Sequence, residues 1–79
     1  MNERISIDPN ICGGQPCIKG TRIPVYIILD LLEAGYSFER IVKECYPQIT
    51  PKDIKTCISY AKELVKAKSS IERNKSIKP

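Results

Sequence analysis

The chain has 79 residues, enough for one small domain whose hydrophobic core is marginal. Charged residues make up 28% and apolar residues 42%, as in ordinary folded proteins. Thirteen basic and nine acidic side chains give a net charge of +4, and there is no histidine. Because histidine is the usual general base and completes Ser-His and Cys-His nucleophile pairs, its absence leads us to expect a protein that is not an enzyme.

The excess positive charge lies close to the C-terminus. Residues 1–65 hold eight basic and eight acidic side chains, whereas residues 66–79 hold five basic and one acidic. The net charge is therefore no argument that the folded part binds nucleic acid. We predict a folded domain over residues 1–67 and a basic, flexible tail over residues 68–79.

The N-terminal residues lack the basic and apolar regions of a signal peptide, and the longest apolar run, residues 25–29, is far shorter than the ~20 residues of a membrane span. We therefore expect a cytoplasmic protein. Its cysteines are Cys12, Cys17, Cys45 and Cys57. In that compartment we expect them to be reduced thiols. A four-cysteine zinc site is the alternative, but the last two lack the close pairing that such sites use, so we expect no metal and no other cofactor.

The first quarter of the chain has the pattern of a strand followed by turns. Residues 4–8 alternate polar and apolar side chains, and residues 17–23 form a second extended piece broken at Gly20. We predict a short β-hairpin with one unpaired edge and four isoleucines facing the core: Ile5, Ile7, Ile18 and Ile23. The stretch from residue 13 to 21 lacks the Gly-Lys order of a nucleotide-binding P-loop, so its glycines are assigned to positive-φ turns.

The first predicted helix covers residues 25–34, between Pro24 and Gly35. One apolar stripe of this helix consists of Val25, Ile28, Leu29 and Leu32. Ile27 and Leu31 form a second stripe, which a single helix in a small domain does not need. These two residues are therefore predicted to bind a partner, unless the hairpin covers them.

Two further helices are predicted. A helix of about eight residues begins after Ser37, an N-cap residue, and ends before Pro47. The last helix begins with a capping box formed by Thr50 and Asp53, and its periodicity ends near residue 67. Its predicted apolar face consists of Ile54, Cys57, Ile58, Ala61, Leu64 and Val65.

A short helix, a turn and a longer helix together are typical of a helix-turn-helix motif. The predicted fold is mainly α: a three-helix bundle of the homeodomain-like or winged helix-turn-helix type, after a short N-terminal β-hairpin. In such folds the last helix enters the major groove. The candidate DNA-binding residues are Arg40, Lys43, Lys52, Lys55, Thr56, Ser59 and Lys62. The plainer interpretation is that they are ordinary solvent-facing residues of amphipathic helices.

A set of dispersed residues also matches a known family. The matching positions are Asp8-Pro9, Gly13-Gly14, Pro16, Gly20-Thr21-Arg22-Ile23-Pro24, Gly35, Tyr46-Pro47, Thr50, Asp53-Ile54 and Tyr60-Ala61. Over residues 4–65 the chain closely resembles the small prokaryotic family called domain of unknown function 433. The resemblance implies a helix-turn-helix fold. It also implies an antitoxin that binds a ribonuclease-like toxin of the PIN type and represses its own promoter.

Two functions are therefore expected. The first is an antitoxin of a type II toxin–antitoxin pair, which binds operator DNA through the third helix and acts as a homodimer. The alternative is a protein-interaction module with no DNA-binding role, which docks on itself or on a partner. In addition, the basic residues Arg73 and Lys75 are candidate contacts to an acidic site on the toxin.

Overall fold

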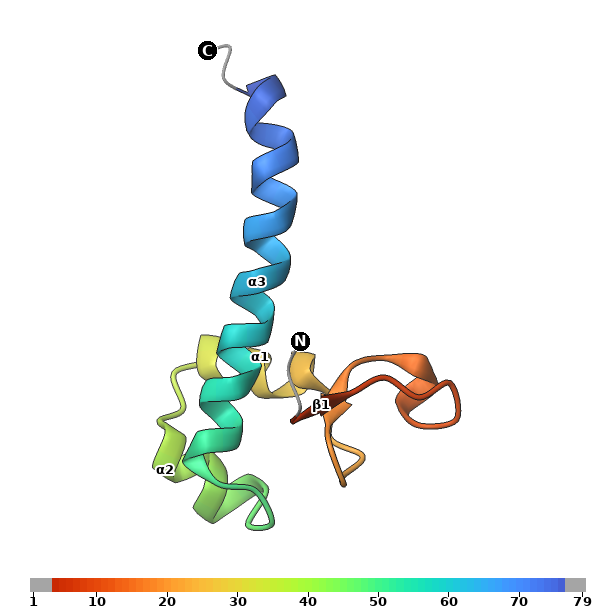
Figure 1. Cartoon of the computed structure of the whole chain (residues 1–79). Coiled ribbons are helices and arrows are strands. Elements are labelled where there is room, and N and C mark those ends of the chain that lie inside the picture. Colours follow the sequence, from red (N-terminus) through yellow and green to blue (C-terminus); the bar gives the residue numbers. More distant parts are fainter. Residues whose placement is uncertain (1–3, 77–79) are drawn as a thin grey trace.

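The structure, a computed structural model, describes the backbone of residues 4–76 and the side chains of residues 4–66 (Figure 1). In chain order its elements are β1 (Ile5–Ser6), η1 (Cys12–Gly14), β2 (Cys17–Ile18), α1 (Val25–Glu33), α2 (Phe38–Arg40), η2 (Ile41–Cys45) and α3 (Pro51–Ser76). In this part of the chain the fold is mainly helical, with one small two-stranded antiparallel sheet. This agrees with the predicted mainly α class and its short N-terminal hairpin.

The hairpin is shorter than its alternating pattern predicts. Ile5 pairs with Ile18 and Ser6 with Cys17, and the ladder ends there. The chain then turns at Asp8, whose carboxylate accepts a hydrogen bond from the Asn10 amide at 2.9 Å. The prediction that Ile7 faces the core is wrong: its side chain is 61% exposed, because it lies beyond the last paired residue.

A tight turn brings the second strand back to the helices. Gly20 has a φ of +81°, a conformation that glycine adopts without a steric penalty. The hydroxyl of Thr21 donates to the Ile18 carbonyl at 2.7 Å and accepts from the Ile23 amide at 3.0 Å. This turn, with its positive-φ glycine as predicted, places Ile18 and Ile23 side by side in the core.

The central helices follow the predicted boundaries closely. Ser37 caps α2, since its hydroxyl accepts the Arg40 amide at 3.1 Å. The helix then widens into η2, a π-helical turn in which the Tyr46 amide donates to the Ile41 carbonyl five residues back, at 2.8 Å. Tyr46 leaves helical geometry, as expected for a residue before proline.

The start of α3 is fixed by the predicted capping box. The Thr50 amide donates to an Asp53 carboxylate oxygen at 3.0 Å, and the Asp53 amide donates to the Thr50 hydroxyl at 3.3 Å. The other Asp53 oxygen accepts from Arg4 at 3.1 Å, which ties the N-terminal segment to this helix. At its far end α3 continues to Ser76 rather than ending near residue 67, because no glycine or proline occurs between Pro51 and that residue.

The core lies where the hairpin, α1, η2 and the first half of α3 meet. Ile28, Ile41 and Ile54, one from each helical segment, are fully buried and are packed with Cys57. The second half of α3 leaves this core and rises away from the rest of the fold (Figure 1).

The predicted apolar face of α3 is therefore only partly correct. Ile54 and Cys57 are buried, but Ile58, Leu64 and Val65 are 38%, 54% and 62% exposed. Helical periodicity gives the face of a residue and not its distance from the core, so it assigned these three to the interior.

Candidate functional site

One face of α3 carries a row of five exposed polar residues, four of them lysines, which we call the basic stripe. It consists of Lys52, Lys55, Ser59, Lys62 and Lys66, all exposed. Their spacing alternates between three and four residues, so they lie along a single helical face. At 1.5 Å per residue the stripe is about 21 Å long. Lys66 was not among the candidate DNA-binding residues, although the same spacing reaches it.

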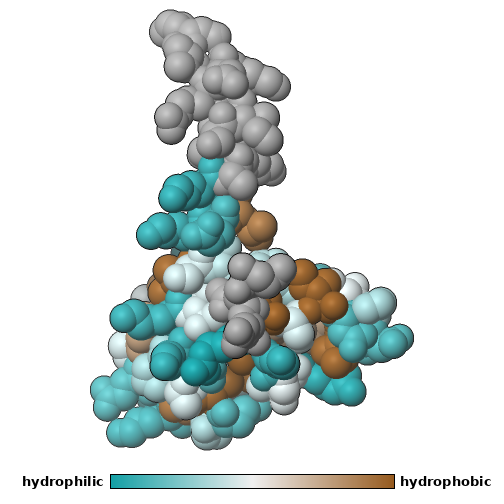
Figure 2. Space-filling model, in the orientation of Figure 1, coloured by the Kyte–Doolittle hydropathy of each residue, from teal (hydrophilic) through white to brown (hydrophobic). Residues whose placement is uncertain are grey.

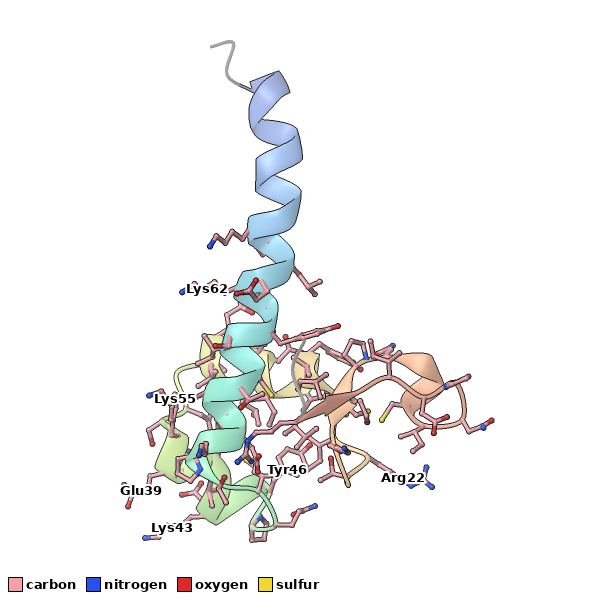
Figure 3. All side chains as sticks on the ribbon, in the orientation of Figure 1. Arg22, Glu39, Lys43, Tyr46, Lys55 and Lys62 are labelled. Carbon is pink, nitrogen blue, oxygen red and sulfur yellow. The ribbon has the colours of Figure 1, made fainter. Side chains whose placement is uncertain are left out.

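The stripe is a region of uncompensated positive charge. In Figure 3, Lys55 and Lys62 project from the same side of α3, away from Arg22 on the N-terminal segment. Among the side chains that the structure describes, the ion pairs are Arg4–Asp53, Arg40–Glu44 and Lys43–Glu39, and none includes a lysine of the stripe. The four ammonium groups are therefore available to bind an anion.

The other candidate DNA-binding residues are already engaged. Arg40 is paired with Glu44 at 3.0 Å and lies over the ring of Tyr36, 4.3 Å from its centre. The hydrogen bond to the Glu44 carboxylate raises the pKa of this guanidinium above its usual value. Lys43 lies 4.0 Å from a carboxylate oxygen of Glu39.

The hydroxyl of Thr56 is engaged as well. It donates to the Lys52 carbonyl at 3.0 Å, within α3, and the side chain is half-buried. The sequence pattern does not show which of the seven candidates already have a partner. Their partners in the structure distinguish the lysines of α3 from the rest.

A second surface of α3 forms an apolar groove of about 250 Å³ with the start of α1. The residues that line the groove are Gln15, Pro16, Val25, Tyr26, Leu29, Tyr60, Ala61 and Leu64. Tyr26 and Leu64 are 52% and 54% exposed to solvent. Figure 2 shows hydrophobic side chains gathered on the side of α3 that faces the N-terminal segment, and hydrophilic ones along its opposite side.

The groove and the basic stripe occupy different faces of the same helix. At about 100° per residue, the groove residues Tyr60, Ala61 and Leu64 are centred roughly half a turn away from the centre of the stripe. A ligand in the groove therefore leaves the lysines accessible.

The apolar groove does not coincide with the predicted second stripe of α1. Ile27 and Leu31 are both half-buried, and Leu31 packs against the core. Tyr26 and Leu64, which were not among the predicted partner-binding residues, expose much more of their side chains. Periodicity places Leu64 on the apolar face of its helix but does not pair it with Tyr26, because the groove forms between helices that are distant in sequence. The side chains of the other predicted partner-binding residues, Arg73 and Lys75, lie outside the described residues.

The cysteines are free thiols. Cys17 and Cys57 are buried, and Cys12 and Cys45 are half-buried. In the part of the chain that the structure describes, no three Cys, His, Asp or Glu side chains lie close enough to hold a metal ion. Burial, followed by the charge of Asp53, raises the pKa of Cys57 to about 11. Burial and a hydrogen bond to Cys12 raise the pKa of Cys17 to about 11 as well.

These raised pKa values predict slow alkylation of Cys17 and Cys57 in the folded protein. The thiolate is the reactive form, and at pH 8 only about one thiol in a thousand ionises at a pKa of about 11. With iodoacetamide we expect both to react at least about 100-fold more slowly than in urea, and about tenfold faster for each pH unit between 8 and 10. Peptide mass mapping measures the rates; equal rates in buffer and in urea would contradict the assignment.

Residues 5–61 match the family described as "Protein of unknown function (DUF433)". The chain belongs to this family. The predicted resemblance is thus confirmed, and the DUF433 match includes the capping box and the first three positions of the basic stripe. Lys62, Lys66 and the rest of α3 lie beyond it.

Two DUF433 relatives illustrate the likeness. The chain is 37% identical over 59 residues to the uncharacterized protein y4eO of Sinorhizobium fredii (strain NBRC 101917 / NGR234). The aligned region covers 75% of this chain and 26% of that protein. It also superposes on the crystal structure of a DUF433 member protein from Anabaena variabilis ATCC 29413. That match has a TM-score of 0.71 and 32% identity, and covers 76% of this chain and 58% of the other. The chain thus spans about a quarter of one relative and just over half of the other.

None of the helices in the described part of the chain combines the length and the apolar character that crossing a membrane requires.

Proposed function

We propose that this DUF433 chain is a DNA-binding antitoxin, with no catalytic activity of its own, that acts as a homodimer and holds a PIN-type ribonuclease toxin. The observation that carries the DNA-binding half is the basic stripe: four lysines along about 21 Å of α3, with no ion-pair partner among the described side chains, on the face opposite the apolar groove. The resemblance to antitoxins of this family supports the toxin-binding half.

Electrostatics favour DNA as the ligand of the stripe. Duplex DNA carries one negative charge per ~1.7 Å of its axis, and lysines that neutralise phosphates release counterions. The α2–η2 segment, a short connection and α3 follow one another as in a helix-turn-helix motif. In that arrangement Lys52 and Lys55, in the first turns of α3, are the side chains nearest the bases, and Lys62 and Lys66 contact phosphates.

The paired cations of α2 and η2 have a lesser part in this proposal. Exposed ion pairs such as Arg40–Glu44 contribute little to the stability of a protein, so DNA phosphates can displace the carboxylate. The displaced carboxylate then remains close to the phosphates and repels them. We therefore assign Arg40 and Lys43 smaller contributions to affinity than the lysines of α3.

A double substitution tests the DNA-binding role. We expect Lys52→Ala with Lys55→Ala to weaken binding to the chain's own upstream DNA by roughly ten- to a hundredfold, as measured by gel shift or fluorescence anisotropy. The matched control is Lys19→Ala with Arg22→Ala, which removes the same charge from exposed residues outside α3. We expect at most about a threefold loss in the control. An unchanged shift in the α3 variant would exclude the basic stripe as the DNA-binding surface.

The apolar groove supports the second candidate function, a protein-docking module without DNA binding. Salt separates the two functions, because phosphate contacts weaken steeply with ionic strength and apolar contacts do not. A complex with the product of a neighbouring gene that persists at about 1 M salt, together with absence of DNA binding at about 50 mM, would favour the docking module alone.

A further inference from the structure

The groove has the dimensions of an anchor site for a few side chains. Its volume of about 250 Å³ compares with the ~150 Å³ cavity that holds one benzene, so one or two large apolar side chains fit. Eight residues line it, whereas each side of a stable protein dimer contributes ~20–30 residues. The groove is therefore too small to hold a second copy of this chain by itself.

The surroundings of the groove indicate the charge of its ligand. Leu64 is the last residue of α3 that lines the groove, and the helix continues from there to Ser76. Residues 66–76, the remainder of this helix, contain four basic residues and one acidic residue. A segment that enters the groove and continues along α3 thus follows a stretch of net charge +3. Like charge repels a second copy of this stretch, whereas carboxylates are attracted to it.

We infer that the groove between α1 and α3 binds an acidic amphipathic helix of a partner protein. One or two apolar side chains of that helix enter the groove against Tyr26, Ala61 and Leu64, and its glutamates or aspartates lie along the basic continuation of α3. This is the helix-in-groove mode of recognition, in which side chains at i, i+3 or i+4 act as anchors. The inference deepens the partner-binding half of the proposed function and rests on it.

The probe for this inference is a designed peptide. A fluorescein-labelled peptide of about 18 residues carries leucines at i, i+4 and i+7 and glutamates on its other faces. A second peptide has lysines in place of the glutamates. We expect the full chain to bind the acidic peptide below about 1 mM in fluorescence anisotropy, and the basic peptide at least about tenfold more weakly.

Two neighbouring positions on α3 provide a matched pair of variants. Leu64→Glu places a carboxylate in the groove, whereas Val65→Glu adds the same charge at the next residue, which is 62% exposed and does not line it. We expect at least about tenfold weaker binding of the acidic peptide in the first variant and at most about threefold in the second. Tyr26→Glu, on the α1 side of the groove, should weaken binding of the acidic peptide as much as Leu64→Glu does. All three sites are exposed, and circular dichroism verifies the fold.

Several outcomes would overturn the inference. Equal losses at residues 64 and 65 would place the peptide outside the groove. No binding of the acidic peptide by about 1 mM, or equal binding of the basic one, would remove the proposed ligand chemistry. A wild-type dimer that Leu64→Glu converts to a monomer, with no change for Val65→Glu, would assign the groove to a second copy of the chain.

Failure of this inference is distinguishable from failure of DNA binding. Lys52→Ala with Lys55→Ala lies on the opposite face and should weaken DNA binding while the peptide affinity stays within about threefold. Loss of DNA binding with intact groove binding would contradict only the DNA-binding half of the proposed function. DNA binding without any peptide binding would contradict only the groove inference.

Discussion

Replacement of Ile54 by alanine is expected to lower the free energy of unfolding by about 3–4 kcal/mol. Ile54 lies at the centre of the core, fully buried against side chains from α1 and η2. Its truncation removes buried apolar surface and leaves a cavity that the short helices cannot close completely. A domain of this length is stable by about 4–12 kcal/mol in total, so the variant loses a large part of its stability. Urea denaturation followed by circular dichroism measures the difference.

The matched control is Ile58→Ala, the same substitution one helical turn further along α3. Ile58 is 38% exposed, so less apolar surface returns to water and no closed cavity forms. We expect a loss of about 1 kcal/mol or less. Similar losses at the two positions would show that both isoleucines are buried to the same extent, contrary to the described packing.

The second large effect concerns the salt dependence of DNA binding. If four lysines of the basic stripe neutralise phosphates, the slope of log affinity against log salt is about −3.6 for one chain. Affinity then falls about 150-fold between about 50 and 200 mM salt, and further for a dimer, which carries two stripes. Anisotropy titrations with a fluorescent duplex at several salt concentrations measure this slope.

The lysine variants make the slope specific to α3. Lys52→Ala with Lys55→Ala should reduce its magnitude by up to about 2, one unit for each lost phosphate contact. Lys19→Ala with Arg22→Ala should leave it nearly unchanged, because these residues precede the helices and do not belong to the stripe. The same reduction in both variants would mean that DNA responds to the overall charge of the chain and not to the stripe.

Local chemistry made the helix boundaries predictable. The Ser37 cap, the Thr50–Asp53 capping box and the stop before Pro47 all rest on bonds between residues close in sequence, and each occurs as expected. The far end of α3 differs, because no such local bond or stop signal marks it. The periodic apolar pattern fades near residue 67, but helix-compatible residues continue and no local signal stops the helix.

The candidate site was predictable only in part. The lysines of α3 could be selected because their spacing places them opposite the apolar face, which depends on helix geometry alone. Whether a cation already has a partner depends on side-chain positions, and this separates Arg40 and Lys43 from the basic stripe. The groove was not predictable, since it forms between Tyr26 and Leu64, residues 38 positions apart in the chain.

The sequence by itself determined the family, the mainly helical class, the helix starts and the face of α3 that each residue occupies, because these depend on local geometry and on motif order. Only the tertiary structure decided how far along α3 the core extends. Ile54 and Ile58 share one periodic face, yet one is fully buried and the other is 38% exposed. The neighbours that cover a residue come from distant parts of the chain, so burial is a property of the assembled fold.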